Sequence, residues 1–245
     1  MKAIILAAGI ASRLRPLTDK RPKCLLEIDS KNLLQRTIDA LLKNNIDDII
    51  IVTGYLHEMI ETFVIEHYRD LNVEFIYNDR YETTNNIYSL WLTKSSVLNT
   101  DVLLLDSDIL FDPDIIATLL ASYHPSCLAL NKHELGEEEI KVIADSDNHI
   151  KEISKTCSIE KAIGESVGIE KFSNDFVQHL FAELDDMILN KHQVDIFYES
   201  AFENIIKNGA ALYAIDTTSL FSIELDTIED FNQAKKIIKL NCIEN

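Results

Sequence analysis

Residues 6–26 read Leu6-Ala7-Ala8-Gly9-Ile10-Ala11-Ser12-Arg13-Leu14-Arg15-Pro16-Leu17-Thr18-Asp19-Lys20-Arg21-Pro22-Lys23-Cys24-Leu25-Leu26. The apolar run at 3–6 predicts a strand, and Gly9 then opens a loop. That loop is basic: it places five Lys or Arg between positions 13 and 23, where an even spread would place roughly one. A glycine at the carboxyl end of a strand lets backbone N–H groups approach a phosphate. We therefore predict a phosphate-binding loop with Arg13 and Lys23 as its cations, the alternative being an ordinary solvated loop.

Strand-like and helix-like patterns alternate from residue 2 to about residue 130. The strand candidates are continuous apolar runs, which are typical of strands covered on both faces. The pattern therefore predicts an α/β fold with a mixed, mainly parallel central sheet flanked by helices. The expected strands are 3–6, 48–52, 73–77 and 102–105, and the expected helices are 33–42, 59–68 and 113–122.

After about residue 135 the apolar runs become shorter and are separated by polar turns. No linker, charge block or repeat divides the chain, so we expect one domain over residues 1–245 with a more irregular second part from 131. The expected strands there are 140–144, 150–153, 167–169, 211–215 and 221–225, and the expected helices are 175–188, 201–207 and about 227–240.

The composition excludes several classes of partner. The chain has 23 basic and 41 acidic side chains, a net charge of −18, which disfavours nucleic acids and anionic membranes. Its apolar runs are too short to cross a bilayer, and its start lacks the pattern of a signal peptide. The four cysteines, Cys24, Cys127, Cys157 and Cys242, are scattered, which predicts reduced thiols and not a zinc site or a disulfide framework. We expect a soluble cytoplasmic protein, monomeric or homodimeric.

Two acidic pairs follow predicted strands. Asp106 and Asp108 come at the end of the run 102–105, where side chains two residues apart share a face and could point at one site. Carboxylate oxygens at a strand end suit Mg²⁺ together with substrate phosphates, although a helix cap or a solvated turn is the alternative. Glu224 and Asp226 repeat the spacing directly before the last helix, where capping by Asp226 or Thr227 is the alternative.

The loop resembles the signature L-A-A-G-x-G-x-R-L-x-P-L-T…P-K-x-L of nucleotidyltransferases that activate sugar phosphates and alcohol phosphates. Ala11 stands where the family has its second glycine, a substitution that strains the backbone if this position needs a positive φ. The resemblance covers nearly the whole chain and implies a Rossmann-like, GT-A-like nucleotidyltransferase fold. It further implies that residues 1–130 bind a nucleotide and that 131–245 bind the acceptor.

The resemblance also implies the chemistry. A phosphate oxygen of the acceptor attacks the α-phosphorus of a nucleoside triphosphate and pyrophosphate leaves, so no general base is needed. Mg²⁺ is the implied cofactor, with Asp108 and Asp226 as ligands and Asp106 behind them. Arg13 would stabilise the leaving pyrophosphate, and Lys23 a reacting phosphate. Lys161 stands where members often place another phosphate-binding lysine, although a solvated lysine fits as well.

Residues 77–91 point to the substrates. Sugar-phosphate members tend to have a glycine-rich turn here, whereas this chain has no glycine between Gly54 and Gly136 and offers amides instead. The stretch Asn85-Asn86-Ile87-Tyr88-Ser89-Leu90 resembles choline-phosphate and related cytidylyltransferases. Amides can donate hydrogen bonds to O2 and N3 of cytosine. We therefore predict CTP as the donor and a small phosphorylated amino alcohol, or a similar phosphonate, as the acceptor. In the alternative, an Asn caps a helix beginning near residue 87, and Tyr88, Leu90 and Trp91 belong to the core.

The candidate site residues fall into four groups. Aromatic and anionic side chains would form the wall that a substrate ammonium prefers. A sugar-1-phosphate nucleotidyltransferase using UTP, dTTP or GTP, and a catalytically silent regulatory homologue, are the alternative functions. The candidates are Arg13 and Lys23 for catalysis; Leu6, Ala7, Ala8, Gly9, Asn78, Asn85, Asn86, Ser89 and Asp106 for the nucleotide; Tyr81, Tyr88, Lys161, Glu165, Tyr198 and Glu199 for the acceptor; and Asp108 and Asp226 for the metal.

Overall fold

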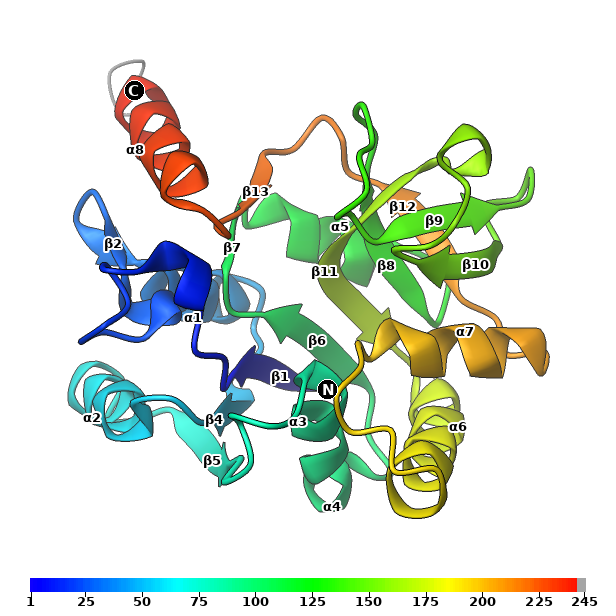
Figure 1. Cartoon of the computed structure of the whole chain (residues 1–245), viewed down its shortest axis with the longest axis horizontal. Helices are drawn as coiled ribbons and strands as arrows, with labels where there is room; N and C mark the ends of the chain where they lie inside the picture. The colour runs from blue at the N-terminus through cyan, green and yellow to red at the C-terminus, as the bar shows by residue number, and fades with distance from the viewer. Residues whose placement is uncertain (242–245) are drawn as a thin grey trace.

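The computed structural model describes residues 1–241, with side chains described up to 238. A nine-stranded mixed sheet runs through the centre, with helices on both sides (Figure 1). The strands are β1 (Lys2–Ala7), β2 (Glu27–Ile28), β3 (Lys31–Asn32), β4 (Asp48–Thr53), β5 (Asn72–Tyr77), β6 (Val102–Asp106), β7 (Ile109–Phe111), β8 (Cys127–Asn131), β9 (Lys141–Ala144), β10 (Ile150–Ser154), β11 (Gly164–Phe172), β12 (Tyr213–Asp216) and β13 (Ser222–Glu224).

The helices lie between these strands. Eight of those within residues 1–241 are α-helical, and four short turns, η1 to η4, are 3₁₀ or π in type. The α-helices are α1 (Leu33–Lys43), α2 (His57–His67), α3 (Asn86–Leu92), α4 (Lys94–Val97), α5 (Asp114–Ala121), α6 (Asn174–Asp185), α7 (Glu199–Lys207) and α8 (Ile228–Asn241), and the turns are η1 (Ser12–Leu14), η2 (Lys23–Leu25), η3 (Ile159–Lys161) and η4 (Asp186–Asn190).

The first half of the sheet is parallel. β1 lies between β4 and β6, and Ile5 pairs with Ile51 on one side and Leu105 on the other. β5 extends the parallel part beyond β4. β11 then pairs antiparallel with β6, β8 and β9, and so joins the two halves of the chain in one sheet. These pairings confirm the predicted mixed α/β class.

The apolar residues of β1 show why the sheet is covered on both faces. Ala3 and Ile5 pack with α1, α2 and α5, whereas Ile4 and Leu6 pack with α3, α6 and α7. Successive side chains of a strand point to opposite faces, so a continuous apolar run requires an apolar layer on each side. Because β1, β4, β5 and β6 run in the same direction, their carboxyl ends lie at one common edge of the sheet.

A third, smaller core fixes α8 to the N-terminal half. Leu14 from the basic loop, Leu110 of β7 and Phe231 of α8 are buried together there. β13 pairs with β7 and leads directly into α8, so the end of the described chain returns to the loop after β1. Figure 1 shows α8 on the opposite side of the molecule from β9 and β10.

Several features differ from the sequence-based expectation, which does not include β2, β3, β8 or α4. The three-residue strand β7 has no counterpart in the pattern, because its partner β13 lies more than a hundred residues away. The helix expected over 175–188 instead ends at Asp185 and continues as the π-type turn η4. None of the helices described is long and apolar enough to cross a bilayer. Cys24, Cys127 and Cys157 are free and buried, and Cys242 lies outside the described residues.

Candidate active site

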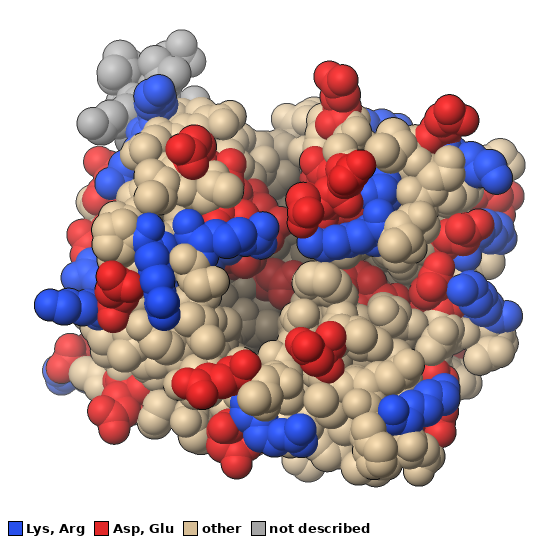
Figure 2. Space-filling model, in the orientation of Figure 1, with Lys and Arg blue, Asp and Glu red and all other residues tan. Residues whose placement is uncertain are grey.

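A cleft of about 980 Å³ opens at the carboxyl ends of the parallel strands. It is lined by the loop after β1, the turn between β6 and β7, β11, the segment before α7 and the start of α8. Figure 2 shows it as a hollow between the two halves of the molecule, with acidic side chains inside and basic ones on its rims. Ligands of open α/β sheets bind at this edge, because loops rather than strands lie there.

The loop after β1 forms one wall of the cleft. Ala7, Ala8 and Gly9 line it, and a Cβ added at Gly9 would meet no atom within 4 Å, so the backbone is open to a ligand there. Ala11 has φ 50° and ψ 52°, the left-handed conformation. The position therefore needs the positive φ that the family's glycine accommodates, and the alanine costs on the order of 1 kcal/mol.

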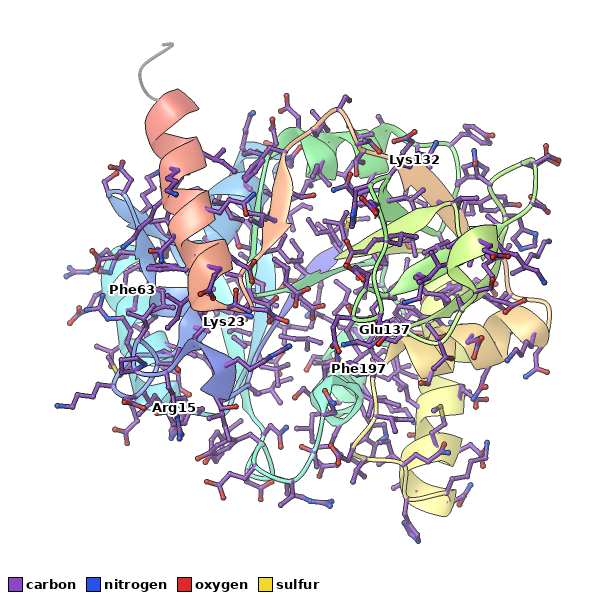
Figure 3. The ribbon with its side chains drawn as sticks, turned by 45° about the horizontal axis from the view of Figure 1, so that its top comes forward. Arg15, Lys23, Phe63, Lys132, Glu137 and Phe197 are labelled. Atoms are coloured by element: carbon purple, nitrogen blue, oxygen red, sulfur yellow. The ribbon has the colours of Figure 1, made fainter. Side chains whose placement is uncertain are left out.

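Lys23 is the central cation of the site. It is only 9% exposed, and its Nζ donates hydrogen bonds to Asp108 Oδ2 and Asp226 Oδ1, both at 2.8 Å. Burial alone would lower the pKa of Lys23, but the two carboxylates outweigh it and hold that pKa above its ordinary value. Lys23 is therefore an ammonium at physiological pH. Figure 3 shows it near the start of α8.

Arg13 is the second cation, and it is more exposed. Its Nη2 donates to Asp226 Oδ2 at 2.6 Å, while 60% of its side chain is accessible. Burial would raise the pKa of Asp226, but Lys23 and Arg13 hold it below the ordinary value. Asp226 is therefore ionised, and Arg13 remains free enough to turn towards a phosphate.

Asp106 and Asp108 both line the cleft, but not because they share a strand face. β6 ends at Asp106, and Asp108 lies in the turn before β7, so the expected alternation does not extend to it. Asp108 faces Lys23, whereas Asp106 accepts a hydrogen bond from the Tyr198 hydroxyl at 2.9 Å. Burial and the nearby carboxylates raise the pKa of Asp106 well above its ordinary value.

Three carboxylates fit a divalent cation. Asp108, Glu224 and Asp226 offer oxygens that all lie within 4.8 Å of one another, and Asp108 Oδ1 is buried with no hydrogen-bond partner among the described residues. Oxygen ligands of this kind are those that Mg²⁺ prefers. Thr227, and not Asp226, caps α8, because its hydroxyl accepts from the Asp230 N–H at 3.2 Å. Glu224 is not among the metal ligands expected from the sequence, although its two-residue spacing from Asp226 is a usable signal.

The four amide and hydroxyl residues predicted for the nucleotide also line the cleft. Asn78 is buried and holds the wall together, since its Nδ2 donates to Thr84 and to Ser89 Oγ. The side-chain carbonyl of Asn85 caps α3, and that of Asn86 accepts from the Tyr198 N–H. Both carbonyls are therefore in use, and the NH₂ groups of Asn85 and Asn86 are what these side chains offer to a base.

The far end of the cleft, on the side of β11 and α7, is lined in part as expected. Glu165 and Glu199 line this end, whereas Tyr81 lines the cleft beside Gly54 and Tyr55, near the loop after β1. Glu165 Oε2 lies 2.7 Å from Nε2 of His133, another lining residue. Phe197 and Lys155 also line it without having been predicted, and the Lys155 Nζ lies 4.7 Å from the Phe197 ring centroid. Phe197 directly precedes the Tyr198-Glu199 pair, and this adjacency is the only signal for it in the sequence.

The structure does not bring Tyr88, Lys161 and Tyr198 to the cleft, so their expected substrate contacts are corrected. Tyr88 faces the other side of α3, where its ring packs on Trp91 and beneath the Arg80 guanidinium. Tyr198 is completely buried and acts on Asp106 instead. Lys161 is exposed on η3, consistent with the alternative of a solvated lysine.

Cations that can hold phosphates lie directly beside carboxylates that can hold a divalent ion, on one cleft at the carboxyl ends of the parallel strands. This arrangement is suited to phosphoryl-group transfer, and the protein is an enzyme of the nucleotidyltransferase class. It belongs to the MobA-like NTP transferase domain family, whose family model matches residues 3–161.

Two curated relatives match along most of the chain. The choline-phosphate cytidylyltransferase of Streptococcus pneumoniae is 27% identical over 244 residues, covering 98% of this chain and 99% of that protein. The CTP:phosphoglutamine cytidylyltransferase of Campylobacter jejuni is 28% identical over 242 residues, covering 88% and 93%. The solved structure of the S. pneumoniae CTP:phosphocholine cytidylyltransferase superimposes with a TM-score of 0.80 over 97% of this chain and 98% of that one. These likenesses confirm the predicted family and its GT-A-like fold.

Proposed function

We propose that this enzyme transfers a cytidylyl group from CTP to the phosphate or phosphonate of a small amino alcohol derivative, with release of pyrophosphate and with Mg²⁺ as cofactor. The observation that carries nucleotidyl transfer is the position of the Lys23 ammonium between Asp108 and Asp226. The choice of CTP is supported by the two relatives that match along most of the chain, both of which are named as cytidylyltransferases.

Charge neutralisation is the main requirement of this reaction, because nucleophile and electrophile are both anionic. Asp108, Glu224 and Asp226 would hold Mg²⁺, which supplies Lewis-acid neutralisation of the reacting phosphates when bound. Lys23 is ionised before substrate arrives, and Asp108 and Asp226, on binding Mg²⁺, would release its ammonium for a reacting phosphate. Arg13 lies beside the open backbone of Gly9, on the wall we assign to the triphosphate, and would stabilise the leaving pyrophosphate.

The choice of base rests on the NH₂ groups of Asn85 and Asn86. Cytosine presents two adjacent acceptors, O2 and N3, whereas uracil has an N–H donor at position 3. Two amide donors facing that edge favour cytosine, because uracil would place a donor against a donor. Their carbonyls are already occupied by the backbone N–H groups of Asn86 and Tyr198, which fixes the direction of donation.

The acceptor assignment rests on the charge of the far end of the cleft. Glu138, Glu139, Glu165 and Glu199 line this region against Lys155 and His133. A surplus of carboxylates disfavours a second anionic group on the acceptor and favours a cationic one. Sugar phosphates carry no such cation, and the sugar-phosphate nucleotidyltransferases among the relatives are more distant.

Pyrophosphate release tests the proposed function. The purified enzyme would be mixed with Mg²⁺, each of CTP, UTP, dTTP and GTP, and a panel of phosphorylated alcohols, phosphonates and sugar 1-phosphates. We expect release that depends on Mg²⁺ and on the acceptor, fastest with CTP. No release with any pair would support the catalytically silent alternative.

We also place the enzyme in the cytoplasm, since its free cysteines fit a reducing compartment.

A further inference from the structure

Three buried carboxyl groups lie together behind the far end of the cleft. The charge of Glu199 raises the pKa of both Asp106 and Glu170, and within residues 1–241 none of the three forms an ion pair with Lys, Arg or His. Asp106 is bonded to the Tyr198 hydroxyl, and Glu170 accepts only a long hydrogen bond, 3.4 Å, from Ser166 Oγ. The molecule thus places three carboxyl groups in its interior without a resident cation.

Glu199 is the member of this group that lines the cleft with a carboxylate oxygen left unpartnered in the described part of the chain. It lines the cleft at the first residue of α7, is only 5% exposed, and its Oε2 has no hydrogen-bond partner among the described residues. A buried carboxylate oxygen without a partner is costly unless it is protonated or meets a cation. Burial raises the pKa of Glu199 to about 7, so the group can be ionised under physiological conditions when a cation is present to compensate it.

Lys155 is a cation of the protein near Glu199, but its ammonium already has other partners. Lys155 Nζ donates to Glu138 at 3.3 Å and lies over the Phe197 ring. Its field lowers the pKa of Glu199 in part, but no ion pair within 4.0 Å joins the two residues. The Phe197 ring therefore already has a cation partner within the protein.

We infer that Glu199 binds the ammonium group of the acceptor through an N–H···O hydrogen bond, so that the acceptor is a phosphorylated amine with at least one N–H when protonated and not a quaternary ammonium compound. The inference rests on the proposed function and narrows its acceptor class. A protonated amine supplies both the charge and the donor that Glu199 Oε2 lacks. A quaternary ammonium supplies the charge alone.

The aromatic residues of the cleft support this distinction. Quaternary ammonium groups are recognised by several aromatic faces around one point. The aromatic rings lining this cleft within the described residues, apart from His133, are Tyr81, Phe197 and Phe221, which come from three separate segments and form no ring pair with one another. Tyr88 and Tyr198, the other aromatic residues expected at the acceptor, face elsewhere, as does Trp91 beside Tyr88.

A methylation series tests the inference in the wild-type enzyme. Initial rates would be measured with CTP, Mg²⁺ and phosphoethanolamine, its N-methyl and N,N-dimethyl derivatives, phosphocholine and propyl phosphate. We expect kcat/KM to fall by roughly 10- to 100-fold when the last N–H is replaced, the change expected for one hydrogen bond to a charged group. Phosphocholine turned over as fast as phosphoethanolamine, or faster, would overturn the inference and leave cytidylyl transfer intact.

Variants on α7 identify the group responsible. Glu199→Gln should lower kcat/KM for phosphoethanolamine by a similar factor, leave KM for CTP unchanged and reduce the preference over propyl phosphate. Glu203→Gln is the matched control, since Glu203 lies one turn further along α7, pairs with Lys207 and does not line the cleft. If Glu199→Gln kept the wild-type preference for phosphoethanolamine over propyl phosphate, Glu199 would not be the group that binds the ammonium.

Calorimetric binding of the same acceptors, with Mg²⁺ and a non-hydrolysable CTP analogue, separates the two proposals. Stronger binding of the N–H-bearing amines without cytidylyl transfer would retain the amine site and contradict the proposed reaction. Cytidylyl transfer at equal rates to acceptors with and without an N–H would contradict the amine site and retain the proposed reaction.

Discussion

Lys23 Nζ lies 2.8 Å from Asp226 Oδ1, although 203 residues separate the two in the chain. The contact joins the loop after the first strand to the entrance of the last helix, next to the small core that holds Leu14 and Phe231. The phosphate-binding cations and the metal-binding carboxylates are thereby positioned by the same packing. Loss of a charge on either side leaves the other partly buried without its partner, so we expect the site to respond to single substitutions.

The two aspartates beside Lys23 should be essential. Asp108→Asn and Asp226→Asn each remove an anionic ligand from a site with few protein ligands, and we expect turnover to fall by more than about 100-fold with the fold retained. Rates measured against Mg²⁺ concentration, with circular dichroism as the check on folding, test this. Asp114→Asn, in an exposed pair with Lys43, is the control. Near-normal rates of both variants at limiting Mg²⁺ would contradict the metal assignment.

Arg13 should act on kcat more than on KM. The charge of the leaving pyrophosphate grows in the transition state, so Arg13→Ala should lower kcat by roughly 100-fold, on the order of 3 kcal/mol. Arg15→Ala is the control on the same loop, because Arg15 pairs with Asp19 and does not line the cleft. Steady-state kinetics with varied CTP separate the two constants. A variant with unchanged kcat would show that Arg13 is only a surface residue.

Ala11 should tolerate glycine but not a branched side chain. Its φ of 50° is accessible to glycine without strain and is unfavourable for a β-branched residue. We expect Ala11→Gly to raise the free energy of unfolding by up to about 1 kcal/mol, and Ala11→Val to lower it by at least that amount. Urea denaturation of the three proteins measures this. Equal stability of the valine variant would mean that the loop adopts another conformation.

The parts of the site that the sequence predicts are those formed by neighbours in the chain. The β1 run, Gly9 and the basic residues up to Lys23 lie within about twenty positions, and each leaves a local signal. The apolar run before Asp106 also leaves a local signal in the sequence. The segment after that strand leaves none, because the chain turns at Asp108 into β7, whose pairing with β13 exists only in the folded molecule.

The acceptor end is the part that the sequence predicts least well, because packing and not local pattern decides which side of an element faces the cleft. The sequence places Tyr88 and Tyr198 in a substrate wall, yet Tyr88 lies on the side of α3 that is turned away from the cleft. Tyr198 is drawn inward by its hydrogen bond to Asp106. Phe197 and Glu199, on either side of Tyr198, reach the cleft instead, and that outcome depends on how the segment before α7 lies against β11.

The stability of the protein should depend on pH through Glu199. In the folded state the Glu199 carboxyl keeps its proton up to about pH 7, whereas in the unfolded chain it loses the proton near the ordinary carboxyl pKa. Raising the pH through this window therefore lowers the free energy of unfolding, by on the order of 3 kcal/mol if Glu199 acts alone. Glu199→Gln does not titrate. Its stability relative to the wild type should thus rise between pH 5 and pH 8 in urea denaturation, and a constant difference would contradict the burial of an uncompensated carboxyl.

The most direct test of the account compares two complete reactions in the wild-type enzyme. Values of kcat/KM would be measured with Mg²⁺ for CTP plus phosphoethanolamine or an aminoalkylphosphonate, and for UTP or dTTP plus glucose 1-phosphate. The amides of Asn85 and Asn86 and the acidic far end of the cleft predict that a CTP pair with an amine-bearing acceptor is the fastest. Faster turnover of glucose 1-phosphate with UTP or dTTP would contradict the account.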